Sequence, residues 1–166
     1  MQGVKCAAAG NLGVVRVSPK RLFLVVAPAA LLASVDQIVK ASVQTPWWAF
    51  HHRSQGWVVL SMALLIGAVV LALVPSRFVA VAAGVMSGGA LGNLLSARWN
   101  GNWVQNPLVI GNYRHGLAFN PADVFFMLGN LLLMSSLIVL TIRHRERLPA
   151  SHAWERRLLR RLHLGR

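Results

Sequence analysis

Apolar residues run along the chain in four long blocks that short polar segments separate. At a rise of about 1.5 Å per residue, a helix needs about 20 apolar residues to cross the hydrocarbon core of a membrane. Each block reaches this length or nearly so. We therefore expect four membrane helices, at residues 22–41, 57–74, 78–95 and 124–142.

The composition agrees with lipid as the solvent. Hydrophobic residues make up 55% of the 166 residues and charged residues only 13%, which is too little polar surface for a soluble domain of this size. The predicted fold class is an all-α integral membrane protein with a four-helix bundle at residues 22–143. Residues 1–21 form an N-terminal tail and residues 144–166 a basic tail.

The distribution of basic residues predicts the orientation. The net charge is +13, but the centre of the chain is almost uncharged, so a basic face for nucleic acid is not expected. With both termini in the cytoplasm, most Lys and Arg residues lie inside, as membrane proteins prefer. The basic residues left on the outer side are then Lys40, Arg53, Arg98 and Arg114.

The basic tail has its own pattern. Residues 151–166 alternate Trp and Leu with Arg, which favours an amphipathic helix lying on anionic lipid at the inner surface. A solvated basic tail is the alternative. The polar segment at residues 97–122, rich in Asn, Gly, Trp and Pro, is expected to lie along the outer interface and to return partly toward the bundle.

This topology sorts the four acidic residues. Glu146 and Glu155 fall inside among arginines, whereas Asp36 and Asp123 share the outer side. A carboxylate at the edge of a membrane helix is costly to desolvate and is therefore a candidate functional group. Asp36 has Lys40 one helical turn away, so an interfacial ion pair is its simpler role. Asp123 is the stronger candidate.

Two further patterns have structural explanations. Gly84, Gly88 and Gly92 form a small-residue stripe that lets a neighbouring helix approach closely, and packing within the bundle is the expected use. The outer histidines are too scattered for a metal site, which needs three or four ligands at fixed spacing. We therefore expect neither a metal nor a cofactor; these histidines are His51, His52 and His115.

Three segments together carry a resemblance to a known family. Residues 35–40 read Val-Asp-Gln-Ile-Val-Lys, residues 88–93 Gly-Gly-Ala-Leu-Gly-Asn, and residues 119–123 Phe-Asn-Pro-Ala-Asp. In this order and topology the chain resembles signal peptidase II, the lipoprotein signal peptidase of the bacterial inner membrane.

The resemblance implies an aspartic endopeptidase that cleaves lipid-modified prolipoproteins on the outer face. Two aspartates there share a proton, one activating water and the other supporting the carbonyl oxygen. Asp123 matches the second aspartate of that family. Asn93 and Asn120 match its supporting asparagines, and Gly129 also falls in place.

The chain departs from that family at the first aspartate, where Gln105 stands. An amide cannot take up a proton at neutral pH, and the loss of an acid–base group typically costs about a hundred- to ten-thousand-fold in rate. Arg98 is one place from the arginine of the family and is expected to take over its supporting role, whereas residues 51–55 replace an Asn-x-Gly-x-Ala stretch. The first outer loop is also shorter, which counts against the small outer sheet that cradles the peptide there.

Three functions follow as alternatives. The first is a catalytically impaired relative that keeps a groove for a lipoprotein precursor, a lipid or a membrane partner. The second is an active peptidase with a rearranged dyad of Asp36 and Asp123. The third is a non-catalytic accessory subunit that packs against a membrane protein partner through Gly84, Gly88 and Gly92.

Overall fold

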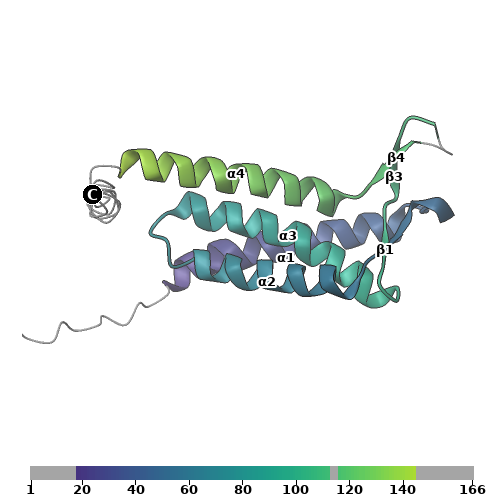
Figure 1. Ribbon diagram of the computed structural model, residues 1–166, viewed down its shortest axis with the longest axis horizontal. Helices are drawn as coiled ribbons and strands as arrows, with labels where there is room; N and C mark the ends of the chain where they lie inside the picture. Colours follow the sequence, from purple (N-terminus) through teal and green to yellow (C-terminus); the bar gives the residue numbers. More distant parts are fainter. Residues whose placement is uncertain (1–17, 113–115, 145–166) are drawn as a thin grey trace, which may run out of the picture.

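The computed structural model describes residues 18–112 and 116–144, which form four helices and a set of short strands at one end (Figure 1). The first helix begins, and the fourth helix ends, at the end of the bundle that lies away from the strands. The N-terminal tail to residue 17, Arg114, His115 and the basic tail from residue 145 lie outside the described residues. The helices are α1 (Pro19–Ser42), α2 (Gln55–Leu71), α3 (Arg77–Trp99) and α4 (Pro121–Arg143).

Three of these helices, α1, α3 and α4, are long and apolar enough to cross a membrane. Helix α4 is only 11% buried along its most apolar stretch, so its large side chains, such as Met127 and Leu131, face outward. In water such a face would be strongly unfavourable, whereas in a bilayer it meets acyl chains. The prediction of a membrane protein built from apolar helices is confirmed.

The second helix differs from its predicted bounds. Helix α2 has 17 residues and ends at Leu71, although the apolar block continues to Val74. After Leu71 the backbone tightens into i→i−3 hydrogen bonds, from Ala72 to Val69 and from Leu73 to Val70. Pro75 disfavours the helical conformation for the residue before it, so the helix stops short of the proline.

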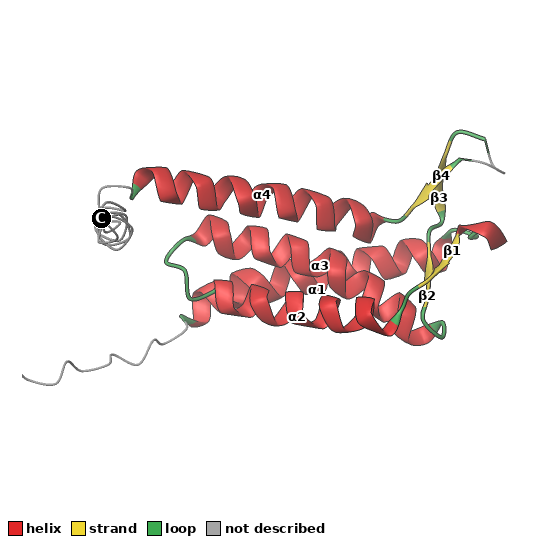
Figure 2. Cartoon of the chain, in the orientation of Figure 1, coloured by secondary structure: helices red, strands yellow, loops and turns green. Residues whose placement is uncertain are grey.

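Helix α3 lies in the middle of the bundle, with α1, α2 and α4 packed around it (Figure 2). Its most apolar stretch is 67% buried, against 22% for α1. The glycine stripe explains the close approach of α1: a Cβ added to Gly84 would lie 2.6 Å from the Val25 carbonyl oxygen, and one added to Gly88 would lie 3.2 Å from that of Ala29. The stripe is thus used within the bundle, and α1 occupies the face that a partner subunit would need.

Helix α4 packs on another face of α3 by the same device. A side chain on Gly89 would collide with the backbone of Ala122 and Phe126, and one on Gly129 with the backbone of Met86. These two glycines bring the start of α4 directly against α3. This contact positions Asp123 beside the polar residues of α3.

The fold is mostly helical, as predicted, but the described segments that connect the helices at one end also contain four short strands that the sequence did not predict. Strand β1 (Phe50–His52) pairs antiparallel with β2 (Trp103–Gln105), and β3 (Leu108–Ile110) pairs with β4 (Leu117–Phe119). A short 3₁₀ helix, Trp47–Ala49, precedes β1. A small sheet therefore forms in spite of the short first loop, because three residues of β1 suffice to pair with β2.

Candidate functional site

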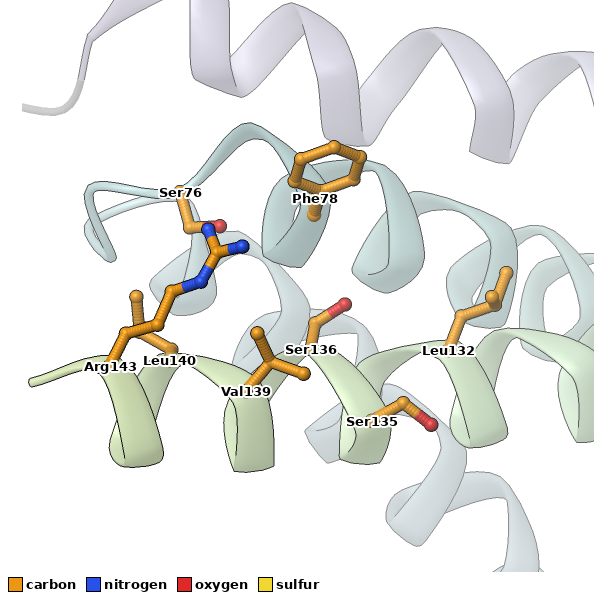
Figure 3. Close-up of a pocket in the computed structure, with 8 residues that line it drawn as sticks. All are labelled: Ser76, Phe78, Leu132, Ser135, Ser136, Val139, Leu140 and Arg143. Carbon is orange, nitrogen blue, oxygen red and sulfur yellow. The ribbon is translucent and has the colours of Figure 1, made fainter.

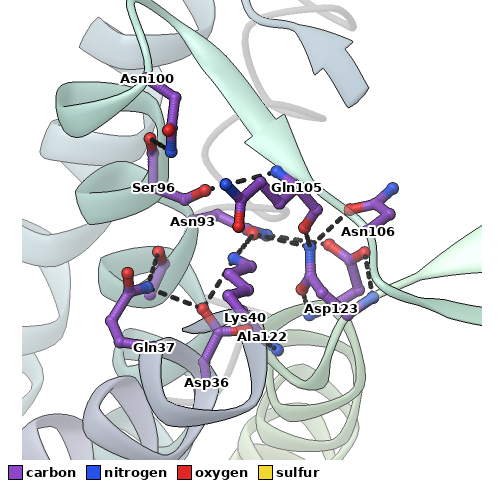
Figure 4. Close-up of polar contacts among 12 residues, drawn as sticks. Asp36, Gln37, Lys40, Asn93, Ser96, Asn100, Gln105, Asn106, Ala122 and Asp123 are labelled. Carbon is purple, nitrogen blue, oxygen red and sulfur yellow. Dashed lines mark hydrogen bonds and ion pairs between the residues drawn. The ribbon is translucent and has the colours of Figure 1, made fainter. Parts of the chain in front are cut away.

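A cluster of polar side chains lies where the helices meet the strands (Figure 4). Asp36 and Lys40 come from the end of α1, Asn93 from α3, and Asp123 from the start of α4. Within an apolar bundle, each of these groups needs a partner, because an unpaired polar group in a low dielectric costs several kcal/mol. The contacts show how each obtains one.

Asp36 is completely buried and paired with Lys40. The Lys40 Nζ lies 2.7 Å from Asp36 Oδ2, and Gln37 Nε2 donates to the same oxygen at 2.9 Å. The other oxygen accepts the backbone N–H of Ala122 at 2.9 Å. This N–H belongs to the first turn of α4, whose free N–H groups and dipole favour a carboxylate. Asp36 thus ties α1 to α4.

Asn93 connects this ion pair with Asp123. Its Oδ1 accepts from Lys40 Nζ at 3.0 Å, while its Nδ2 donates to Asp123 Oδ1 at 2.8 Å. The hydrogen-bond chain therefore runs from Asp36 through Lys40 and Asn93 to Asp123. The two carboxylates are separated by a lysine and an amide, and they share no direct hydrogen bond.

Asn120 and Asp123 form a capping box at the start of α4. The Asn120 Oδ1 accepts the Asp123 N–H at 2.9 Å, and Asp123 Oδ2 accepts the Asn120 N–H at 3.3 Å. The sequence signal for this box, an asparagine followed by proline and then by an acid at the third helical position, was present. The capping box gives Asp123 a structural role in addition to any chemical one.

Gln105 contributes its backbone to the cluster. Its carbonyl accepts from Asn120 Nδ2 at 3.1 Å, and its N–H donates to Ser96 Oγ at 3.3 Å. Within the described part of the chain, no hydrogen bond to its side-chain amide is found. The same Asn120 Nδ2 also donates to Asn106 Oδ1 at 2.6 Å, so Asn106 is a member of the site that the sequence reasoning missed.

Arg98 is not part of this cluster, contrary to the expectation that it supports the site. It lines a separate groove between α2 and α3, together with Asn102 and apolar side chains such as Met62 and Leu94. The arginine lies near the last turn of α3, and the helical rotation at that position carries it to the α2 side, whereas Asn93 faces α1 and α4.

A pocket of about 250 Å³ opens beside Asp123. Asn93 and Asp123 give it a polar edge, and its walls are mostly apolar. Arg53 also lines it, although no motif in the sequence indicated a role for this residue. The remaining lining residues are Trp57, Leu60, Ser61, Leu64, Gly89, Ala90 and Phe126.

Arg53 is held in place by its neighbours. Its guanidinium carbon lies 5.1 Å from the centre of the Trp57 ring, a cation–π contact. Its backbone N–H donates to the Asn102 carbonyl at 2.7 Å. The Nε atom is buried and has no hydrogen-bond partner among the described residues. The sequence did offer one indication that Arg53 could belong to the site: it is one of the few basic residues assigned to the outer side.

A second pocket of similar size lies at the far end of the bundle, between α3 and α4 (Figure 3). The pocket is lined by polar side chains, among them Arg143, Ser76 and Ser136, and by apolar ones such as Phe78 and Val139. It shares no residue with the pocket beside Asp123.

The described residues hold no group of three His, Cys, Asp or Glu side chains that could bind a metal ion.

Comparison with known proteins gives a likeness in fold. No protein-family model matches the chain, and no curated protein matches it in sequence. A solved structure described as "Bacterial membrane enzyme structure by the in meso method at 2.3 A resolution" superposes with a TM-score of 0.50. The two sequences are 17% identical, and the match covers 75% of this chain and 91% of the other. The chain thus has the fold of a bacterial membrane enzyme.

Proposed function

We propose that this protein is a signal peptidase II-like membrane protein that is impaired in catalysis. It binds a lipid-bearing ligand, either a lipid-modified precursor or a membrane lipid, in the pocket beside Asp123. One observation carries the proposal: Asn93 and Asn120 hold the Asp123 carboxylate where it lines this pocket. By the family resemblance, Gln105 stands at the position of the first aspartate.

The chemistry of an aspartate dyad requires two carboxylates that share a proton. Asp36 is not a substitute, because both of its oxygens already accept hydrogen bonds and Lys40 neutralises its charge. Gln105 offers only an amide, which neither accepts nor releases a proton at neutral pH. A single carboxylate can orient water or a ligand, but peptide cleavage loses its general acid–base partner.

Binding makes fewer demands than cleavage. The asparagines, the capping box and the small sheet are present, and together they keep Asp123 in one position. The pocket is largely apolar with a few convergent polar groups, which is the usual form of a ligand site. Its two flanking helices, α2 and α4, have outward-facing apolar surfaces, so a ligand with an acyl chain reaches it from the bilayer.

The test uses the purified protein in detergent with a synthetic precursor peptide that carries a diacylglyceryl cysteine. We expect the peptide to bind and to remain intact by mass spectrometry. The Gln105→Asp variant supplies the missing carboxylate, and we expect it to cleave the peptide, with the cleavage lost in Gln105→Asp/Asp123→Asn. Cleavage by the unmodified protein that disappears in Asp123→Asn would contradict the proposal.

A further inference from the structure

We propose that the pocket beside Asp123 selects phospholipids with an ethanolamine headgroup: Arg53 binds the phosphate, and Asp123 binds the primary ammonium group. The inference rests on the lipid binding proposed above and names its ligand class. It follows from two opposite charges that line one pocket without forming an ion pair with each other.

Arg53 is the anion-binding group. The buried Nε has no hydrogen-bond partner among the described residues, and an unpaired buried donor is costly. A guanidinium offers its N–H groups in a planar fork that matches the oxygens of a phosphate. The Trp57 ring holds this fork from one side, so little side-chain freedom is lost on binding. A phosphate in the pocket supplies the missing acceptor.

Asp123 is the cation-binding group. Asn93 and the Asn120 backbone each donate one hydrogen bond, to different oxygens of the carboxylate, which leaves lone pairs on both. The side chain is only partly buried and faces the pocket. A primary ammonium carries three donors and is drawn to a carboxylate by charge.

Charge balance explains why a ligand with both signs fits best. The cluster contains Asp36 and Asp123 with one negative charge each, and Lys40 and Arg53 with one positive charge each, so the site is neutral without a ligand. A purely anionic headgroup would leave Asp123 facing a second negative charge in a low-dielectric environment. A zwitterion keeps the sum at zero and pairs each charge with its opposite.

The position of the pocket suits the acyl chains. Leu60 and Leu64 come from α2 and Phe126 from α4, with Gly89 and Ala90 of α3 as the floor. Helices α2 and α4 each pack on α3 but make few contacts with each other, and they flank α3 on different sides (Figure 1). Both helices carry outward-facing apolar side chains, so acyl chains extend along α3 into the bilayer.

The experiment measures retention of phospholipids on the full-length protein by native mass spectrometry. The probes are phosphatidylethanolamine, phosphatidylglycerol and phosphatidylcholine with identical acyl chains. We expect phosphatidylethanolamine to bind at least about tenfold more tightly than the other two. Phosphatidylglycerol lacks the cation, and the quaternary ammonium of phosphatidylcholine cannot donate a hydrogen bond to Asp123.

Two variants separate the roles of the two charges. Arg53→Gln weakens all three lipids, because it removes the phosphate contact, and Arg53→Lys restores part of the affinity. Asp123→Asn removes only the preference for ethanolamine and leaves phosphatidylglycerol bound as well or better. Arg98→Gln, in the separate groove between α2 and α3, is the matched control and leaves the preference unchanged. Thermal unfolding of each variant in detergent verifies that it is folded.

The outcomes that overturn the inference are distinct from those that overturn the function. Equal retention of the three lipids by the unmodified protein, or an unchanged preference in Asp123→Asn, refutes headgroup selection. If the lipid-modified peptide still binds in an Asp123-dependent way, the proposed function survives that result. If neither phospholipid nor lipid-modified peptide binds, or binding ignores both pocket variants, the function itself fails.

Discussion

Asn93 holds Asp123 in place: its Nδ2 donates to Asp123 Oδ1 at 2.8 Å, across the contact between α3 and α4. The same amide accepts from Lys40 Nζ at 3.0 Å and from Asn120 Nδ2 at 3.0 Å. One side chain, 6% exposed, therefore joins α1, α3 and α4, and it links Asp123 to Asp36 through Lys40. Its oxygen and nitrogen are both used, so no isosteric apolar residue can replace it.

Replacing Asn93 by leucine should destabilise the protein strongly. Leucine has a similar size but leaves Lys40, Asp123 and Asn120 each one partner short, at about 1–3 kcal/mol for each buried group left unpaired. Thermal unfolding in detergent measures the loss. Asn130→Leu is the control, because Asn130 is an exposed residue of α4, and its unfolding temperature should stay near that of the unmodified protein. Equal stability of the two variants would show that the amide network contributes nothing.

The ion pair of Lys40 and Asp36 makes a separate prediction. Lys40→Met leaves Asp36 charged and 0% exposed, and breaking a buried pair in this way costs about 3–5 kcal/mol. The double variant Lys40→Met/Asp36→Asn should recover part of the loss, since asparagine is neutral and still accepts from the Ala122 N–H. Lys20→Met, at an exposed position of the same helix, is expected to be neutral. A double variant less stable than Lys40→Met would argue against the pair.

The glycine contact between α1 and α3 can be tested with a single methyl group. Gly84→Ala places a Cβ about 2.6 Å from the Val25 carbonyl oxygen, so the helices must move apart. We expect a loss of about 1–3 kcal/mol, as for other overpacked cores. Gly67→Ala in α2 has no heavy atom within 4 Å of the new methyl group, and it should be neutral or stabilising by up to about 1 kcal/mol. Unfolding in detergent compares the pair, and an unaffected Gly84→Ala would refute the close packing.

The proposed orientation predicts which positions are accessible from outside the cell. Gln44 is an exposed residue between α1 and the 3₁₀ helix, at the strand end of the bundle. In a Cys6→Ala background, Gln44→Cys should react with a membrane-impermeant maleimide on intact cells. In a separate experiment on the unmodified protein, Cys6 should react with this maleimide only after the membrane is permeabilised. Labelling of Cys6 on intact cells would reverse the assignment based on the charges.

Much of the site was predictable because its residues are rare in their surroundings. Asp123, Asn93 and Asn120 stand out as polar groups in or beside apolar blocks, and the structure brings all three together. Arg98 looked equally suitable by its position in the chain, yet the rotation of α3 turns it into another groove. The roles of Arg53 and Asn106 could not be predicted from the sequence, because an arginine or an asparagine is common in loop segments. Only the pocket and the hydrogen bonds around them indicate that they belong to the site.

The sequence by itself determined the helices and the class of protein, since an apolar block of sufficient length must satisfy its backbone internally when lipid is the solvent. It also set the chemistry available at the site, above all the carboxylates of Asp36 and Asp123 and the amides of Asn93 and Asn120. Only the tertiary structure decided which groups meet. Lys40 and Asn93 are 53 residues apart, and the three-residue strands have no periodic pattern. Contacts of this kind depend on how α1, α3 and α4 are rotated against one another, which the glycine contacts establish when the helices pack.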